Sequence, residues 1–125
     1  MIEDNKYFKK ALNKANEMSI PASIAIVDQG GHLNMFYKME GCFNAAIDIA
    51  IKKAKTAAYT KMSTKDLNDL YRKEQLFGVE STNHGMIYFS GGEPIFEDGN
   101  FIGAIGISGG TPEEDGYIAK AATED

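Results

Sequence analysis

The sequence predicts a mixed α/β domain of the α+β kind, with helices packed on an antiparallel sheet of about five strands. Segments with helical periodicity and β-branched segments follow one another in the order α, β-β, α-α, β-β-β, α. Short glycine turns at Gln29–Gly31 and Asp98–Gly99 separate consecutive strands, and such turns join antiparallel neighbours. They are too short for the crossovers of a doubly wound nucleotide-binding fold.

The first half of the chain contains two predicted helices and one predicted hairpin. Apolar residues at helical spacing predict a helix over about Asp4–Met18. The apolar, β-branched run Ser23–Asp28 and the alternating run His32–Lys38 predict two paired strands. A second helix is expected from Asn44, as its N-cap, to about Tyr59, with an alanine-rich stripe that allows close packing.

The second half predicts a third helix, three strands and a closing helix. A capping-box variant starts the third helix, and a glycine ends it, so that it spans Ser63–Gly78. Strands are expected at Gly85–Phe89, at Pro94–Glu97 and from Phe101 onward. Thr111, with proline next and an acid three residues on, caps the last helix. No repeat or linker interrupts this order, so residues 1–125 form one predicted domain.

Composition and charge exclude several classes of protein. The net charge of −5 argues against a nucleic-acid partner, and the densest basic cluster, Lys52-Lys53-Ala-Lys55, is interpreted as a solvated helix edge. No run approaches the ~20 apolar residues of a membrane span. Acidic residues near the N-terminus are not typical of a secretory signal, and the single cysteine, Cys42, forms no internal disulfide. We therefore expect a cytoplasmic protein without a membrane partner.

The sequence predicts neither a catalytic residue set nor a metal site. Its two histidines lack the spacing of zinc ligands. Ser108 lies in a Gly-x-Ser-x-Gly spacing, but no histidine follows it, which rules out a serine triad. Asp28 and His32 could meet across their hairpin, although an aspartate that forms the turn is the more common arrangement. Enzymatic activity is accordingly not expected.

The segment Gly103–Asp115 is the candidate ligand site. It is predicted to be a strand, a glycine turn and a capped helix start, an arrangement that presents backbone N–H groups at one spot. Ser108, Gly109 and Gly110 would hold the ligand opposite the pair Gly91-Gly92. Acids in the first turn of the helix oppose a strongly anionic ligand, so a group such as one carboxylate is expected. The alternative is a turn with a purely structural role.

Five motifs, in order, resemble the GlcG/HbpS family, which includes the C-terminal domain of PduO proteins. They are Ile26-Val-Asp-Gln-Gly-Gly-His-Leu33, Lys38-Met-Glu40, Lys53-Ala-Lys-Thr-Ala57, Gly91-Gly-Glu-Pro-Ile95 and Gly103-Ala-Ile-Gly-Ile-Ser-Gly-Gly110. The resemblance implies a profilin-like three-layer domain, homo-oligomers and, in some members, roles linked to haem or corrinoids. It also places the family's recurring lysine and threonine at Lys53 and Thr56, and makes His32 the better candidate for a haem ligand.

The sequence therefore favours a non-enzymatic domain that binds a small ligand, such as haem, a corrinoid-related molecule or a small carboxylate. Two alternatives remain open. One is an oligomeric structural or interaction module without a ligand, and the other is a haem-degrading enzyme. The expected binding residues are His32, Lys53, Thr56, Gly91, Gly92, Ser108, Gly109 and Gly110.

Overall fold

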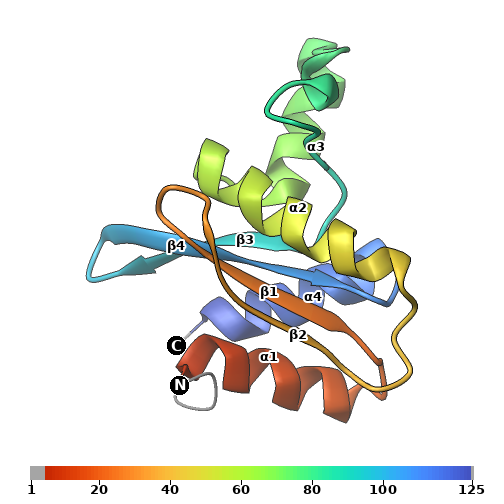
Figure 1. Ribbon diagram of the computed structural model, residues 1–125. Helices are drawn as coiled ribbons and strands as arrows, with labels where there is room; N and C mark the ends of the chain where they lie inside the picture. The colour runs from red at the N-terminus through yellow and green to blue at the C-terminus, as the bar shows by residue number, and fades with distance from the viewer. Residues whose placement is uncertain (1–4, 125) are drawn as a thin grey trace.

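The computed structural model describes residues 5–124. Its elements, in chain order, are α1 (Lys6–Glu17), β1 (Ser23–Asp28), β2 (Leu33–Lys38), α2 (Ala45–Thr60), α3 (Thr64–Glu74), the short 3₁₀ turn η2 (Val79–Ser81), β3 (Gly92–Glu97), β4 (Asn100–Ser108) and α4 (Pro112–Thr123). The four strands form one antiparallel sheet in the order β2-β1-β4-β3. Helices α1 and α4 cover one face, α2 covers the other, and α3 projects away from the body (Figure 1). The predicted α+β class is confirmed.

The prediction of a fifth strand at Gly85–Phe89 was wrong, because that segment has no ladder partner in the described part of the chain. The N–H of Ile87 donates instead to the Thr56 hydroxyl, at 3.1 Å. On the edge strand β3, the Gly92 N–H donates to the Thr64 hydroxyl at 2.9 Å, and Pro94 has no N–H to offer. The outer edge of β3 therefore has few donors left for another strand.

Small residues bring α2 directly onto the sheet. Ala50 and Ala54 of α2 are fully buried against β1 and β4. A Cβ at Gly106 of β4 would overlap the carbonyl oxygen of Ala50, so this contact requires glycine. The opposite face carries the larger apolar core, which α1 and α4 close with Tyr7, Phe8, Ala11, Ala15, Ile118, Ala119 and Ala122.

The helix ends follow their predicted caps with two exceptions. Ser63 and Thr111 each accept the N–H three residues on, and Thr111 completes a capping box, as predicted. Asn44 makes no capping hydrogen bond, because its own backbone is already helical. Helix α3 ends at Glu74 rather than near Gly78, since Gln75 adopts the left-handed conformation.

Two sequence-based expectations fall on residues that the structure does not describe. The predicted first helical residue, Asp4, lies outside the described residues, and so do the acids that argue against a secretory signal. Helix α1 begins at Lys6, after Asn5, whose side chain accepts two backbone N–H groups. Over residues 5–124, no helix has the length and apolar character to cross a membrane.

Candidate functional site

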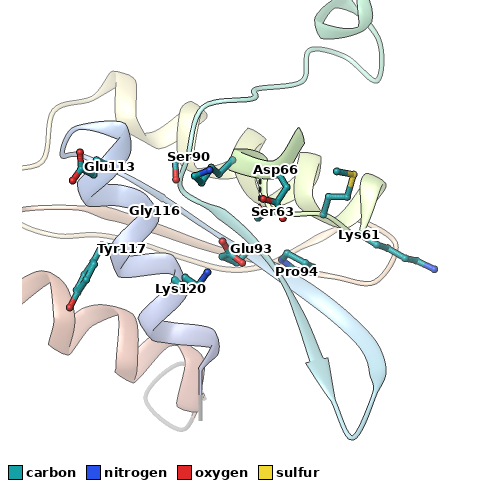
Figure 2. A pocket seen from close by; sticks show the side chains of 12 residues that line it. Lys61, Ser63, Asp66, Ser90, Glu93, Pro94, Glu113, Gly116, Tyr117 and Lys120 are labelled. Atoms are coloured by element: carbon teal, nitrogen blue, oxygen red, sulfur yellow. Dashed lines mark hydrogen bonds between the residues drawn. The ribbon is translucent and has the colours of Figure 1, made fainter. Parts of the chain in front are cut away.

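A groove lies beside the edge strand β3, between α4 and the corner where α2 meets α3 (Figure 2). Its volume is about 730 Å³, and sites for small molecules and cofactors measure roughly 300–1,000 Å³. Its walls are mainly apolar. The lining residues are Lys61, Met62, Ser63, Lys65, Asp66, Ser90, Glu93, Pro94, Glu113, Gly116, Tyr117 and Lys120.

The two walls of the groove are set by local backbone features. On one side, α2 ends at Thr60, and Lys61 directly after it is left-handed. Ser63 then caps α3 by accepting the Asp66 N–H at 3.0 Å. On the other side, Gly116 of α4 faces Ser90. A Cβ at Gly116 would overlap the Ser90 hydroxyl. The missing side chain lets α4 approach the segment that leads into β3.

Glu93 lies in the middle of the groove, with Lys120 of α4 directed toward it (Figure 2). Burial raises the pKa of Glu93 to about 7. Lys120 lowers this pKa, while Asp66 and Glu124 raise it further, and desolvation is the largest of these effects. The groove therefore contains a carboxyl group that exchanges a proton near neutral pH.

Lys53 lies behind the groove rather than in it, and the prediction of a solvated helix edge was wrong at this position. Only 1% of its surface is exposed, because it shares the sheet-facing side of α2 with Ala50. Its ammonium group donates to the Ile107 carbonyl at 2.9 Å and to the Asp115 carboxylate at 3.1 Å. The centroid of the Phe89 ring lies 5.0 Å from the same nitrogen.

The Lys53–Asp115 pair joins α2 and α4, which lie on opposite faces of the sheet (Figure 1). Burial lowers the pKa of Lys53 and raises that of Asp115, because loss of hydration outweighs their mutual attraction. The pair fixes the position of α4, and α4 forms one wall of the groove.

The amides of the predicted glycine turn bind the chain's own acids. The Gly110 N–H donates to Asp115 and the Thr111 N–H donates to Glu114, each at 2.8 Å. Ser108 is buried, with 3% of its surface exposed. The turn therefore anchors the start of α4, and its role as a ligand anchor stays a prediction.

The remaining predicted glycines lie near this turn, at the same end of the sheet. The Gly91 carbonyl accepts the Ile107 N–H at 2.8 Å, and Gly92 pairs with Gly106 in the ladder. Gly109 packs against the backbone that leads into β1. Together with Lys53 they form the support behind the groove, whose surface is lined by other residues.

His32 and Thr56 lie apart from the groove. The side chain of His32 is 83% exposed at the β1–β2 turn, 3.3 Å from the Asp28 carboxylate. That carboxylate also accepts the N–H groups of Gly30 and His32, each at 2.9 Å, so Asp28 forms the turn. Buried Thr56 accepts the Ile87 N–H. Within the described residues, no group of three or more His, Cys, Asp or Glu side chains is placed to hold a metal ion.

Comparison with known proteins identifies the family. The family model described as haem-degrading protein HbpS-like matches residues 5–124. The chain belongs to the HbpS-like family. A Citrobacter freundii relative, an uncharacterized 15.0 kDa protein of the dhaT-dhaS intergenic region, is 34% identical over 113 residues, which cover 89% of this chain and 80% of the relative. The resemblance to the GlcG/HbpS family is thus confirmed.

Two further similarities concern PduO. The corrinoid adenosyltransferase PduO of Salmonella typhimurium is 34% identical over 116 residues, which cover 91% of this chain and 34% of PduO. The chain thus spans about a third of that relative. A crystal structure of a PduOC–haem complex superposes with a TM-score of 0.88 at 33% identity, covering 94% of this chain and 87% of the other.

Proposed function

We propose that the domain binds a small ligand with an apolar body and an acidic group, in the groove between α4 and the α2–α3 corner. The observation that carries this proposal is the groove itself, which combines mainly apolar walls with a volume of about 730 Å³. Its rim carries three lysines, Lys61, Lys65 and Lys120, which can pair with acidic groups. Haem and corrinoid-related molecules are the first candidates, because a related PduO domain has been crystallised with haem.

The residues of the groove fit the haem group. A porphyrin has a flat apolar ring with two carboxylates, which matches apolar walls beside lysines. Met62 and Tyr117, which line the groove, are residue types that ligate haem iron in proteins. Bound haem would supply redox and ligand-binding chemistry at its iron. The residues of this chain would hold the ring and exclude water from one of its faces.

The groove supports binding more directly than catalysis. Its lining contains no histidine, cysteine or serine–base pair that would act on a bound ligand. The support formed by Lys53, Gly91, Gly92 and the Ser108–Gly110 turn keeps the wall α4 in place. We therefore propose a binding role, with haem degradation as the outcome to be tested against it.

A haemin titration tests the proposal. We expect a saturable shift of the Soret band with the purified protein. Lys120→Glu should weaken binding about tenfold, since charge reversal beside a ligand carboxylate changes the binding free energy by about 1.4 kcal/mol. Lys9→Glu is the matched control, because Lys9 is exposed on α1 and lines none of the described cavities.

Absence of a saturable shift, or an equal loss with both variants, would contradict binding in this groove. Loss of the Soret band over hours with a reductant present, at stoichiometric protein, would favour haem degradation instead.

A further inference from the structure

We infer that the groove selects ligands bearing a carboxylate, and that such a ligand binds together with one proton that Glu93 takes up from solution. This inference rests on the proposed function and adds the chemical class of the ligand and the role of Glu93.

Glu93 occupies an unusual position for an acid, because its strand directs it toward a helix. Side chains two residues apart on a strand share one face, and Ile95 belongs to the core beneath α1 and α4. Glu93 therefore points to the α4 side of the sheet, where it is half-buried. No lysine or arginine forms a salt bridge with it among the ion pairs of residues 5–124.

The charges around Glu93 come from two helices. Lys120 of α4 and Glu124, which directly follows α4, lie on one side, and Asp66 of α3 lies on the other. The net effect is unfavourable for the carboxylate form, and its pKa is raised to about 7. Glu113, Lys61 and Lys65 complete the charged groups that line the groove.

This arrangement discriminates between two states of the site. An ionised Glu93 repels a ligand carboxylate, particularly beside Asp66 and Glu124. A protonated Glu93 donates its O–H to that carboxylate in a charge-assisted hydrogen bond, while Lys120 pairs with the ligand from α4. Binding then consumes one proton, the ligand remains a carboxylate, and no other bond changes.

The expected pH dependence follows from the pKa of about 7. Glu93 is mostly protonated at pH 6 and mostly ionised at pH 8, so affinity should be about tenfold weaker at pH 8. A ligand carboxyl with an ordinary pKa of about 4–5 is ionised throughout this range. Its own titration therefore adds nothing to the difference.

Two fluorescent probes with the same apolar body separate the possibilities. 1-Pyrenebutyrate carries one carboxylate, and 1-pyrenebutanol is its neutral counterpart. We expect the affinity for pyrenebutyrate to fall about tenfold from pH 6 to pH 8, and the affinity for pyrenebutanol to stay constant. Calorimetry in two buffers of different ionisation enthalpy should show uptake of about half a proton for pyrenebutyrate at about pH 7, rising toward one proton at about pH 8.

Glu93→Gln removes the proton exchange and keeps a hydrogen-bond donor. In this variant, pyrenebutyrate should bind at pH 8 as it does at pH 6, without proton uptake. Glu40→Gln is the matched control, because it removes an exposed acid outside the groove and should leave the pH dependence intact.

The outcomes distinguish this inference from the proposed function. Binding of both probes with the same pH dependence, or a pH dependence that persists in Glu93→Gln, would overturn the role of Glu93 while leaving a binding groove. Failure of both probes and of haemin to bind at any pH would overturn the proposed function, and the inference with it.

Discussion

Replacing Lys53 by methionine tests the buried pair that holds α4 in place. Methionine keeps most of the length and apolar contact of the lysine stem but has no charge. The change leaves the Asp115 carboxylate, only 2% exposed, without its cation. Asp115 keeps the hydrogen bond from the Gly110 N–H, and the Ile107 carbonyl loses the ammonium donor.

The expected loss of stability is large for a domain of this size. Breaking a buried ion pair by removing one partner costs about 3–5 kcal/mol, and the whole free energy of unfolding of such a domain is about 5–15 kcal/mol. Asp115→Asn removes the remaining charge while keeping an acceptor for Gly110. The double variant should therefore recover most of the loss, to within about 1–2 kcal/mol of wild type.

Urea unfolding followed by circular dichroism measures these differences. The pH dependence of Lys53→Met gives a second measure. Burial already raises the pKa of Asp115, and loss of the lysine raises it further. Stability from a raised carboxyl pKa is present at low pH and is lost as the pH rises through the folded pKa, so the variant should be more stable at about pH 5 than at about pH 8. A loss below about 1 kcal/mol for Lys53→Met, or additive losses in the double variant, would refute this account.

Three further predictions concern the turn, the cap and the assembly. Gly109→Val should unfold the domain or lower its stability by more than about 3 kcal/mol, because Gly109 has a φ of 145° and a Cβ would overlap the Pro21 carbonyl. Thermal melting measures this loss. A stable variant that loses ligand binding would instead make the turn a binding element. Thr111→Ala should lower the free energy of unfolding by about 1 kcal/mol through loss of the capping box, and urea unfolding that matches wild type would contradict the cap's contribution. We also expect a homo-oligomer, because α3 and the segment after it expose several large apolar side chains. Light scattering at micromolar concentration that gives the 13.7 kDa mass of one chain would refute this prediction.

Local patterns predicted most of the fold from the sequence. The β1–β2 turn, the β3–β4 hairpin and the caps at Ser63 and Thr111 form as predicted, because each depends on neighbouring residues. The prediction of a fifth strand was wrong because pairing there depends on residues outside the segment. The Thr64 hydroxyl occupies the Gly92 N–H, and Pro94 has no N–H, so β3 has few donors left for Gly85–Phe89. No pattern within Gly85–Phe89 reveals this.

The candidate site was less predictable, because its two walls, α4 and the corner where α2 meets α3, are distant in the sequence. The glycine turn was visible as a set of backbone donors, and the capping box predicted the role of Glu114. Asp115, which accepts the Gly110 N–H, was interpreted only as a helix-end charge. Lys53 did carry a signal. It falls on the same helical face as Ala50, Ala54 and Ala57, and a lysine in such an apolar stripe requires a buried partner. The place of Glu93 against α4 depends on the three-dimensional packing alone.

Amide chemical-shift mapping tests the central claim, that the groove beside β3 binds the ligand. The ¹⁵N-labelled protein would be titrated with metal-free protoporphyrin IX, and the shifts of all assigned amides followed to saturation. The account predicts saturable changes concentrated at Met62–Asp66, at Glu93 and at Glu113–Lys120 (Figure 2). Changes centred on His32, or no saturable change in the groove while the protein remains folded, would contradict it.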